Sequence, residues 1–525
     1  MKNLLLSTIL ALTSVSIAEL PNIVLIYADD LGYGDVSCYG ATQIQTPNID
    51  QLAAEGRKFT DAHSPSSVCT PSRYGLLTGE YPYRLNLWGP CSPTSKLIID
   101  THQETLASLL KKAGYDTSVI GKWHLGFTND ENDYSARLSP GPQDVGFDYF
   151  FGVPVVNSAP PYVYVENDQI IGLTPDDPIK FEGHGAQHVT PLTPLGKQHG
   201  GRMANWFSGA TKAHELYNDF ELGKQLTERA VHWISEREEA PFFLYFPTTN
   251  IHHPFTPAQR FQGSSEAGWY GDFTHELDWM VGEIVQALKD KGVIDNTLII
   301  FTSDNGGMLN HPGQHAVQHG HDINGPLLGS KFGAWEGGHR IPMIARWPGK
   351  IPAGTTSDAL ISQIDFLATF ASITGQELSD SGDSISQLAT LTGTPPHPVR
   401  EQLMICPNSP YHLSIRKGDW VYIPNQDEGG FQAREVGAHN LGGYASLPLL
   451  GKSTSDARDG QVLPSAPPHQ LYNLATDLGQ TQNVANEHPH VVAELKALLD
   501  TEYATIPKTE RIGWINIAKN PSLKN

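Results

Sequence analysis

The sequence predicts an α/β protein built on a large, mostly parallel sheet with helices on both faces, followed by a smaller C-terminal α+β domain with an antiparallel sheet. Fully apolar runs recur, each bounded by turn residues, and stretches with helical periodicity separate them. Strands that are apolar throughout are typical of parallel sheets, because helices cover both of their faces. The pattern changes after about residue 395, and a chain of 525 residues exceeds what one hydrophobic core usually supports.

Four apolar runs are the clearest strands, at residues 23–28, 117–121, 242–246 and 298–302. Two helices between them are equally readable. Residues 104–112 carry leucines on one face, and residues 273–289 place apolar side chains at helical spacing before the terminator Gly292. We therefore expect helices to alternate with the strands, as in parallel sheets.

Two regions depart from this alternation. Residues 130–212 are rich in Pro, Gly, His and Asn, and a loop of that length predicts a functional rim. Residues 413–416 and 420–423 flank a Lys-Gly-Asp turn and predict a hairpin, and a closing helix is expected at 490–503. The predicted domains are a catalytic α/β domain at 19–394 and a C-terminal α+β domain at 395–525.

The N-terminus predicts export. Lys2 precedes an apolar run that ends in Ser-Ile-Ala, so residues 1–18 have the form of a cleaved signal peptide that leads to the periplasm or to secretion. The run is too short to span a membrane, and no later stretch is long enough. The four cysteines are too few for a disulfide scaffold, although Cys38, Cys91 and Cys406 could include one pair. A net charge of −21 argues against a nucleic-acid partner.

Carboxylates and an amide follow two of the predicted strands. Asp29 and Asp30 end the first, and Asp304 and Asn305 end the last. Ligands bind at the carboxyl ends of strands in open α/β sheets, and these oxygen donors suit Ca²⁺ and Mg²⁺. Each pair on its own could instead cap a helix or turn.

Cationic side chains follow the other two strands. Lys122 and His124 come after residues 117–121, and His252 and His253 follow residues 242–246. One such residue alone is usually a solvated loop residue. Together with the carboxylates, however, they indicate a site that transfers a charged group between oxygens.

Residues 69–79 read CTPSRYGLLTG and carry the most specific signal in the chain. They match at every fixed position the Cys-x-Pro-Ser-Arg-x-x-x-Leu-Thr-Gly signature of the type I, formylglycine-dependent sulfatases. The chain thus resembles these arylsulfatase-like enzymes of the alkaline-phosphatase superfamily. The order of the other motifs, including residues 329–331, agrees with the family, and the resemblance spans about residues 20–375.

The resemblance implies a cofactor and its ligands. In the family a separate maturation enzyme oxidises the motif cysteine, here Cys69, to formylglycine, whose hydrate is a geminal diol. One divalent cation, usually Ca²⁺, is held by the modified cysteine and four strand-end residues, and Arg73 hydrogen-bonds the hydrate. The four ligands that match are Asp29, Asp30, Asp304 and Asn305.

The resemblance also implies a mechanism for the hydrolysis of sulfate esters, and export together with the long polar loops favours a sulfated carbohydrate as the substrate. A diol oxygen attacks sulfur in line and leaves a covalent sulfate on Cys69. Lys122 and Lys331 stabilise the sulfate oxygens as point charges. His252 protonates the leaving alcohol, and His124 takes the proton that allows sulfate to be expelled.

Several interpretations stay open. The same residues would suit a phosphonate or phosphate-ester hydrolase of the superfamily, and an inactive glycan-binding homologue is a third reading. A histidine cluster could be a transition-metal site, a substrate-contact rim or a solvated loop. Several aromatic residues could stack on sugar rings or pack in the core. The histidines are His311, His315, His319 and His321, with His184, His188 and His199 further ambiguous, and the aromatic residues are Trp88, Tyr162, Trp206 and Trp335.

Overall fold

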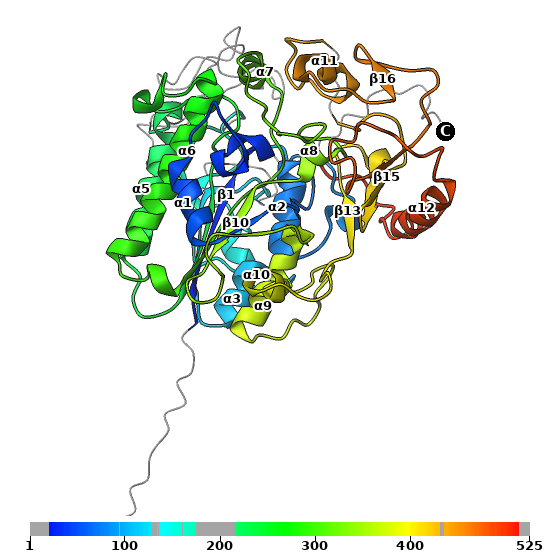
Figure 1. Ribbon diagram of the computed structural model, residues 1–525. Helices are drawn as coiled ribbons and strands as arrows, with labels where there is room; N and C mark the ends of the chain where they lie inside the picture. The colour runs from blue at the N-terminus through cyan, green and yellow to red at the C-terminus, as the bar shows by residue number, and fades with distance from the viewer. Residues whose placement is uncertain are drawn as a thin grey trace, which may run out of the picture.

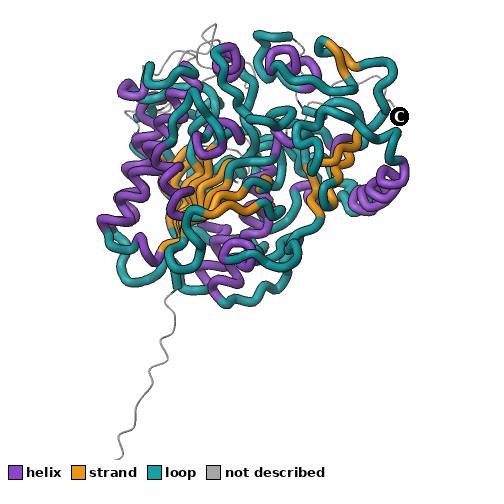
Figure 2. Tube along the Cα trace, in the orientation of Figure 1, coloured by secondary structure: helices purple, strands orange, loops and turns teal. Residues whose placement is uncertain are grey.

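A computed structural model describes residues 20–93, 95–127, 134, 136–159, 161–174, 214, 216–430 and 435–513. Its centre is a ten-stranded sheet with helices packed on both faces (Figures 1 and 2). In sheet order the strands are β11 (Thr355–Ser357), β2 (Arg57–Phe59), β10 (Met343–Arg346), β9 (Thr297–Ser303), β1 (Asn22–Ala28), β8 (Phe242–Pro247), β4 (Asp116–Lys122), β5 (Tyr149–Val153), β6 (Val165–Glu166) and β7 (Gln169–Ile170).

The central strands β9, β1, β8, β4 and β5 run parallel, and the antiparallel pairings lie outward of them at β10, β6 and β7. Both faces of the central strands are buried. In β1, Ile23 and Leu25 enter one apolar cluster while Val24 and Ile26 enter the other. The alternation of side chains along a strand places these neighbours on opposite faces of the sheet. The predicted fold class is therefore confirmed.

Helices complete the two clusters. One face of the sheet is covered by α1 (Pro47–Glu55), α5 (Leu222–Ser235) and α6 (Gly268–Asp290), which lie together in Figure 1. The other face is covered by α2 (Cys69–Thr78), α3 (Leu106–Lys112), α9 (Phe366–Thr374) and α10 (Leu388–Thr392). Burial of these apolar faces, at about 25 cal/mol per Å², is the main force that holds the layers together.

The four predicted strands correspond to β1, β4, β8 and β9, and the two predicted helices correspond to α3 and α6. Both helix starts differ from the prediction. α3 begins at Leu106, because Thr105 caps it by accepting from the Ser108 backbone N–H at 3.1 Å. α6 begins at Gly268, before the predicted start, and its first turns are tied to the preceding loop by Asp272, which accepts from Gly263 N–H at 2.8 Å.

The predicted rim at residues 130–212 is partly regular structure. Its described portions form β5, β6 and β7 at one edge of the sheet. β6 and β7 have two residues each, and such short strands leave no readable periodicity in the sequence. Residues 175–212 of this segment lie outside the described residues.

A second, antiparallel sheet follows in the chain. Its order is β13 (Gln402–Ile405), β14 (Ser414–Lys417), β15 (Trp420–Ile423) and β18 (Gln470–Asn473), and β14 and β15 form the predicted hairpin. α12 (Pro489–Tyr503), the predicted closing helix, packs on this sheet through Leu495 and Leu499. The predicted domain boundary at residue 394 stays a prediction.

Short elements complete the described fold: α7 (His311–Gln318), α8 (Glu336–His339), α11 (Leu447–Leu450), β3 (Ala62–His63), β12 (Ile361–Ser362), β16 (Ala457–Arg458) and β17 (Gln461–Val462). All four cysteines are free thiols, so Cys38, Cys91 and Cys406 include no disulfide pair. Within the described residues, no helix has the length and apolar character needed to cross a membrane. The predicted signal peptide lies outside them.

Candidate active site

The topology of the sheet brings the predicted site residues to one edge. β9, β1, β8 and β4 are neighbours and parallel, so their carboxyl ends meet there. Asp304 follows β9, Asp29 follows β1, His252 lies in the loop after β8, and Lys122 is the last residue of β4. Side chains that are far apart in sequence therefore surround one space, as expected for an open α/β sheet.

Three carboxylates form the deepest part of the site. Asp29, Asp30 and Asp304 are each at most 2 % exposed, and each offers an oxygen within 4.8 Å of the others. Asp29 Oδ1, Asp30 Oδ2 and the Oδ1 atom of Asn305 are buried acceptors without a hydrogen-bond partner. Unpartnered buried acceptors are costly, and a hard cation that binds oxygen would satisfy all three. The donor set thus fits Ca²⁺ or Mg²⁺.

Asp304 holds a proton more readily than an ordinary aspartate. Burial and the neighbouring charge of Asp29 raise its pKa to about 6, although Arg73 opposes this shift. A further positive charge at this point would lower that pKa again, because an opposite charge favours the ionised form. The electrostatics of the carboxylates therefore agree with the fit to a cation.

Arg73 crosses the site from α2. Its guanidinium is completely buried, donates to Asp304 Oδ2 at 2.9 Å and to the Lys122 carbonyl at 3.0 Å, and lies 3.6 Å from Asp29 Oδ1. Burial alone would lower the pKa of Arg73, but Asp304 and the other acidic groups around it, Asp29 among them, together outweigh burial and raise it. The planar guanidinium donates in two directions and so connects the ends of β9 and β4, which the single ammonium group of a lysine could not join.

Two lysines balance the carboxylates. Lys122 Nζ lies 2.6 Å from Asp29 Oδ2, and Lys331 Nζ donates to Asp30 Oδ1. Both side chains are buried. Burial disfavours the charge on Lys331, yet Asp30 and the acidic groups next to it together outweigh burial, so the pKa of the ammonium is raised. The two ion pairs place both amino groups where an anion bound beside the carboxylates would contact them.

The two histidines are held in defined orientations. His252 Nδ1 donates to the carbonyl of His253 at 2.7 Å, which leaves Nε2 on the side of Asp30, 3.8 Å from Oδ2. His124 has a left-handed backbone, with φ 55°, and its Nε2 donates to the carbonyl of Cys91 at 3.2 Å. Burial, together with neighbouring positive charge, lowers the pKa of both imidazoles, so both are neutral near pH 7.

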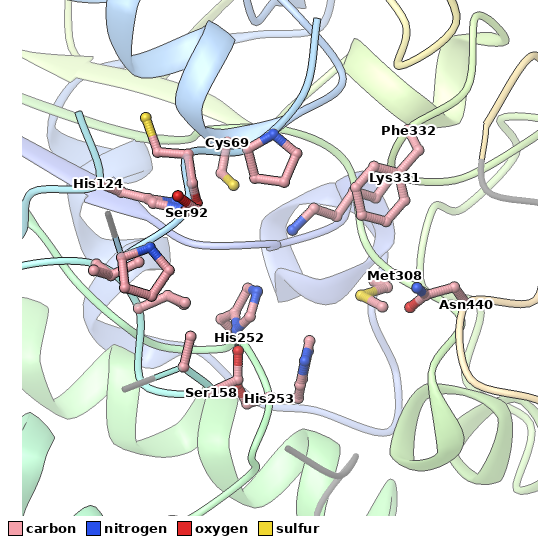
Figure 3. A pocket seen from close by; sticks show the side chains of 16 residues that line it. Cys69, Ser92, His124, Ser158, His252, His253, Met308, Lys331, Phe332 and Asn440 are labelled. Atoms are coloured by element: carbon pink, nitrogen blue, oxygen red, sulfur yellow. Dashed lines mark hydrogen bonds between the residues drawn. The ribbon is translucent and has the colours of Figure 1, made fainter. Parts of the chain in front are cut away.

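Cys69 is the first residue of α2 and lines a cavity of about 370 Å³. Figure 3 shows Cys69 and Lys331 pointing into this cavity from different sides, with His252 facing them and His124 beside Cys69. Burial raises the pKa of the Cys69 thiol, because Lys122 and Lys331 compensate only part of the lost solvation. The unmodified thiol is thus a poor nucleophile here.

Part of the remaining cavity wall comes from the segment 130–212, which the sequence predicts as a functional rim, although the sequence singled out none of its apolar lining residues. Val155, Val156 and Ala159 form one buried apolar patch, and Met308 and Phe332 belong to another. Asn440 adds a polar side chain from the C-terminal part of the chain (Figure 3). These single residues stand in irregular segments, where no motif or periodicity distinguishes lining from loop.

The structure shows where most of the candidate histidines and aromatic residues lie and which interpretation each one fits. His321 is buried and bonds Asp35 at 2.7 Å. The rings of His315 and His319 are tilted against each other with their centroids 4.1 Å apart, and His311 lies near His439. Among the described residues these four imidazoles form no common metal site. Core packing holds for three of the aromatic residues, Trp88, Tyr162 and Trp335. Trp206, His184, His188 and His199 lie outside the described residues.

Comparison with known proteins agrees with this geometry. The family model "Sulfatase" matches residues 21–376. An N-acetylgalactosamine-6-O-sulfatase of Bacteroides thetaiotaomicron is 38 % identical over 508 residues, covering 92 % of this chain and 93 % of the relative. Human arylsulfatase A is 33 % identical over 508 residues, covering 94 % of this chain and 90 % of its own.

A solved structure from work on glycosaminoglycan metabolism by Bacteroides thetaiotaomicron superimposes with a TM-score of 0.78 at 37 % identity, covering 92 % of this chain and 99 % of that one. The fold and the site therefore define a hydrolase of sulfuric esters. The chain belongs to the sulfatase family, as the sequence motif predicts.

Proposed function

We propose that this protein is an exported sulfatase that removes sulfate from a carbohydrate, using a formylglycine made from Cys69 and one bound divalent cation. One observation carries the proposal. Cys69 and Lys331 line one cavity, and Lys331 and Lys122 pair with two of the three clustered carboxylates. The charges of both lysines, of Asp29 and of Asp304 act on the Cys69 thiol, so the nucleophile precursor lies beside them. A site for sulfate transfer needs these three components: a nucleophile, a cation and charge for the sulfate oxygens.

The cation would be held by Asp29, Asp30, Asp304 and Asn305 together with the modified Cys69. When bound, the cation and the formylglycine hydrate would supply Lewis acidity and a nucleophilic oxygen. The oxygen donors accept both Ca²⁺ and Mg²⁺, and the family resemblance favours Ca²⁺. Formation of the aldehyde requires a formylglycine-generating maturation enzyme as a partner.

The side chains of this protein then have separate tasks. Lys122 and Lys331 bind the sulfate oxygens and stabilise the charge that develops on them. Arg73 fixes the relative position of α2 and the strand ends, through Asp304 and the Lys122 carbonyl, and bonds the hydrate. These side chains are buried, so each interaction between their charges is stronger than in solution.

Proton transfer falls to the histidines. His252 presents Nε2 to the leaving alcohol oxygen, because its Nδ1–H is engaged by the His253 carbonyl. It donates from Nε2 as the imidazolium, a form that the negative charge of a bound sulfate ester favours by raising the pKa of the imidazole again. His124 accepts a proton at Nδ1, since its Nε2–H is engaged by the Cys91 carbonyl and Nδ1 has no hydrogen-bond partner. A lowered pKa keeps His124 neutral and therefore able to accept.

The carbohydrate substrate is supported by the relatives and by the cavity. One relative is named for N-acetylgalactosamine-6-O-sulfate, and a similar solved structure comes from work on glycosaminoglycans. A cavity of about 370 Å³ has room for a single sugar ring beside the sulfate. Residues 1–18 would direct the chain to the periplasm or outside the cell, where sulfated polymers are found.

The experiment is to express the protein with and without a formylglycine-generating enzyme. Mass spectrometry then measures the aldehyde in the peptide that contains Cys69, and both samples are assayed on an aryl sulfate and on a panel of sulfated sugars. We expect aldehyde content and sulfate release to rise together. Full aldehyde with phosphate-ester hydrolysis but no sulfate release would overturn the proposal in favour of a phosphoester hydrolase.

A further inference from the structure

The loop at residues 329–334 carries Lys331 into the cavity. It contains no helix or strand, so contacts with neighbouring segments define its path. Lys331 N–H donates to the Gly307 carbonyl at 3.0 Å, and Phe332 N–H donates to the Ser67 carbonyl at 2.8 Å. Phe332 has a φ of 78°, a conformation that residues with side chains rarely adopt. The surroundings must therefore hold this loop in place.

A buried carboxylate lies against the same loop. Glu428 comes from the segment after β15 and is 1 % exposed. Its Oε2 accepts from Ser330 N–H at 3.3 Å, its Oε1 accepts from Gly443 N–H, and its backbone carbonyl accepts from Ala334 N–H at 2.7 Å. The side chain and the backbone of one residue thus fasten both ends of the turn around Lys331.

The fit between loop and carboxylate is close. A Cβ atom added at Gly329 would lie 2.8 Å from Glu428 Oε2, and one added at Gly333 would lie 2.4 Å from it. Two glycines on either side of Lys331 therefore allow the backbone to surround the carboxylate. No residue with a side chain could replace Gly333 without displacing Glu428 or the loop.

Glu428 is an expensive group to bury. Its carboxylate accepts hydrogen bonds from backbone N–H groups, and no cation among the described residues forms an ion pair with it. Burial and the charge of Asp427 raise its pKa to about 8. The Ser330 and Gly443 N–H groups offset part of this cost by donating to the two carboxyl oxygens, so the side chain is tied to the 329–334 loop on one side and to Gly443 on the other.

We propose that Glu428 is a positioning residue, whose carboxylate holds the 329–334 loop so that the Lys331 ammonium reaches the sulfate group. Three contacts connect the two residues: the Ser330 N–H bond, the Ala334 N–H bond and the close packing of Gly329 and Gly333. The inference deepens the proposed function and rests on the role proposed there for Lys331. It also gives the C-terminal part of the chain a task in the active site.

The test is a double-mutant cycle on the matured enzyme with an aryl sulfate. Glu428→Gln keeps the volume of the side chain but replaces one acceptor oxygen by a donor that faces N–H groups. We expect kcat to fall about 10- to 100-fold, since small displacements of a catalytic group have effects of this size. KM and the cation content should change much less. Glu435→Gln, at an exposed glutamate of the same segment, is the matched control and should match the wild type.

The Lys331→Ala background separates positioning from general stability. If Glu428 acts through Lys331, then Glu428→Gln should cause no further loss of kcat once Lys331 is alanine. Losses that multiply in the double variant, or a Glu428→Gln enzyme with the wild-type kcat, would overturn the inference while leaving the proposed function intact. A Lys331→Ala enzyme with the wild-type kcat would instead remove the proposed role of Lys331, and this inference with it.

Discussion

The guanidinium of Arg73 donates to Asp304 Oδ2 across 2.9 Å, and neither side chain is accessible to solvent. Arg73 also bonds the Lys122 carbonyl, so one side chain joins the ends of β9 and β4 to the first turn of α2. This relationship fixes the spacing between Cys69, which begins α2, and the carboxylates. It leads to the first prediction.

Arg73→Lys should impair both activity and stability. Lysine provides one point charge and cannot reach Asp304 and the Lys122 carbonyl together. We expect kcat/KM to fall roughly 100-fold, because α2 would shift against the strand ends. Weakening a buried ion pair should also cost about 3 kcal/mol, measured as the free energy of unfolding in urea. Arg137→Lys, at an exposed arginine, is the control, and an Arg73→Lys enzyme as active as this control would contradict the prediction.

Cys69→Ala should abolish turnover while the fold persists. The substitution removes the thiol that we propose as the precursor of formylglycine, and it takes little volume from a buried position. We expect a loss of stability of about 1 kcal/mol and no sulfate release above background. Thermal unfolding and an aryl sulfatase assay measure the two quantities. Cys406→Ala, at another buried cysteine, should keep its activity, and residual turnover in Cys69→Ala would exclude the formylglycine mechanism.

The strand-end residues of the site are predictable from the sequence for a physical reason. Apolar runs mark the buried strands, and the edge of a parallel sheet brings together whatever follows them. The order of motifs alone therefore indicates that Asp29, Asp304 and Lys122 are neighbours, as the sheet topology confirms. Cys69 is found by its motif, because composition and periodicity say nothing about a cysteine that is to be oxidised.

Other parts of the site depend on contacts between distant segments of the chain, which no local sequence pattern indicates. Glu428 meets Ser330 across about a hundred positions in the chain, and a glutamate in an irregular segment reads as solvated surface. Val155 and Met308 line the cavity from loops, where hydrophobicity carries no period. The exact starts of the helices escape prediction because side-chain bonds, such as that of Asp272, decide them.

Asp304→Asn should empty the cation site. The amide keeps the shape of the carboxylate but removes one of three negative charges around the cation. Elemental analysis should find a bound cation in the wild type and much less in the variant. Added Ca²⁺ at about 100 times its Kd should stabilise the wild type by roughly 2.7 kcal/mol and the variant by far less. Asp358→Asn, at an exposed aspartate, is the control. An unchanged cation content would remove Asp304 from the ligands.

The stability of the protein should fall in acid partly because of His412. This imidazole is buried, its Nε2 donates to the Gln426 carbonyl at 2.9 Å, and burial lowers its pKa to about 4. The unfolded chain binds a proton at an ordinary pKa of about 6.5, whereas the folded protein does not. The stability that follows from this difference is present above about pH 6.5 and is lost as the pH falls toward 4, by about 3 kcal/mol in total.

His412→Gln should therefore unfold with a shallower dependence on pH, because the titrating group is absent while an amide can still donate to the Gln426 carbonyl. The free energy of unfolding in urea, measured at intervals from pH 7 to pH 4, gives the two slopes. Some slope must persist, since burial also lowers the pKa of His339, to about 3. His490→Gln, at an exposed histidine, should keep the wild-type slope. If His412→Gln kept it as well, the imidazole of His412 would have to be protonated in the folded protein, and its bond to Gln426 would then be that of a charged donor.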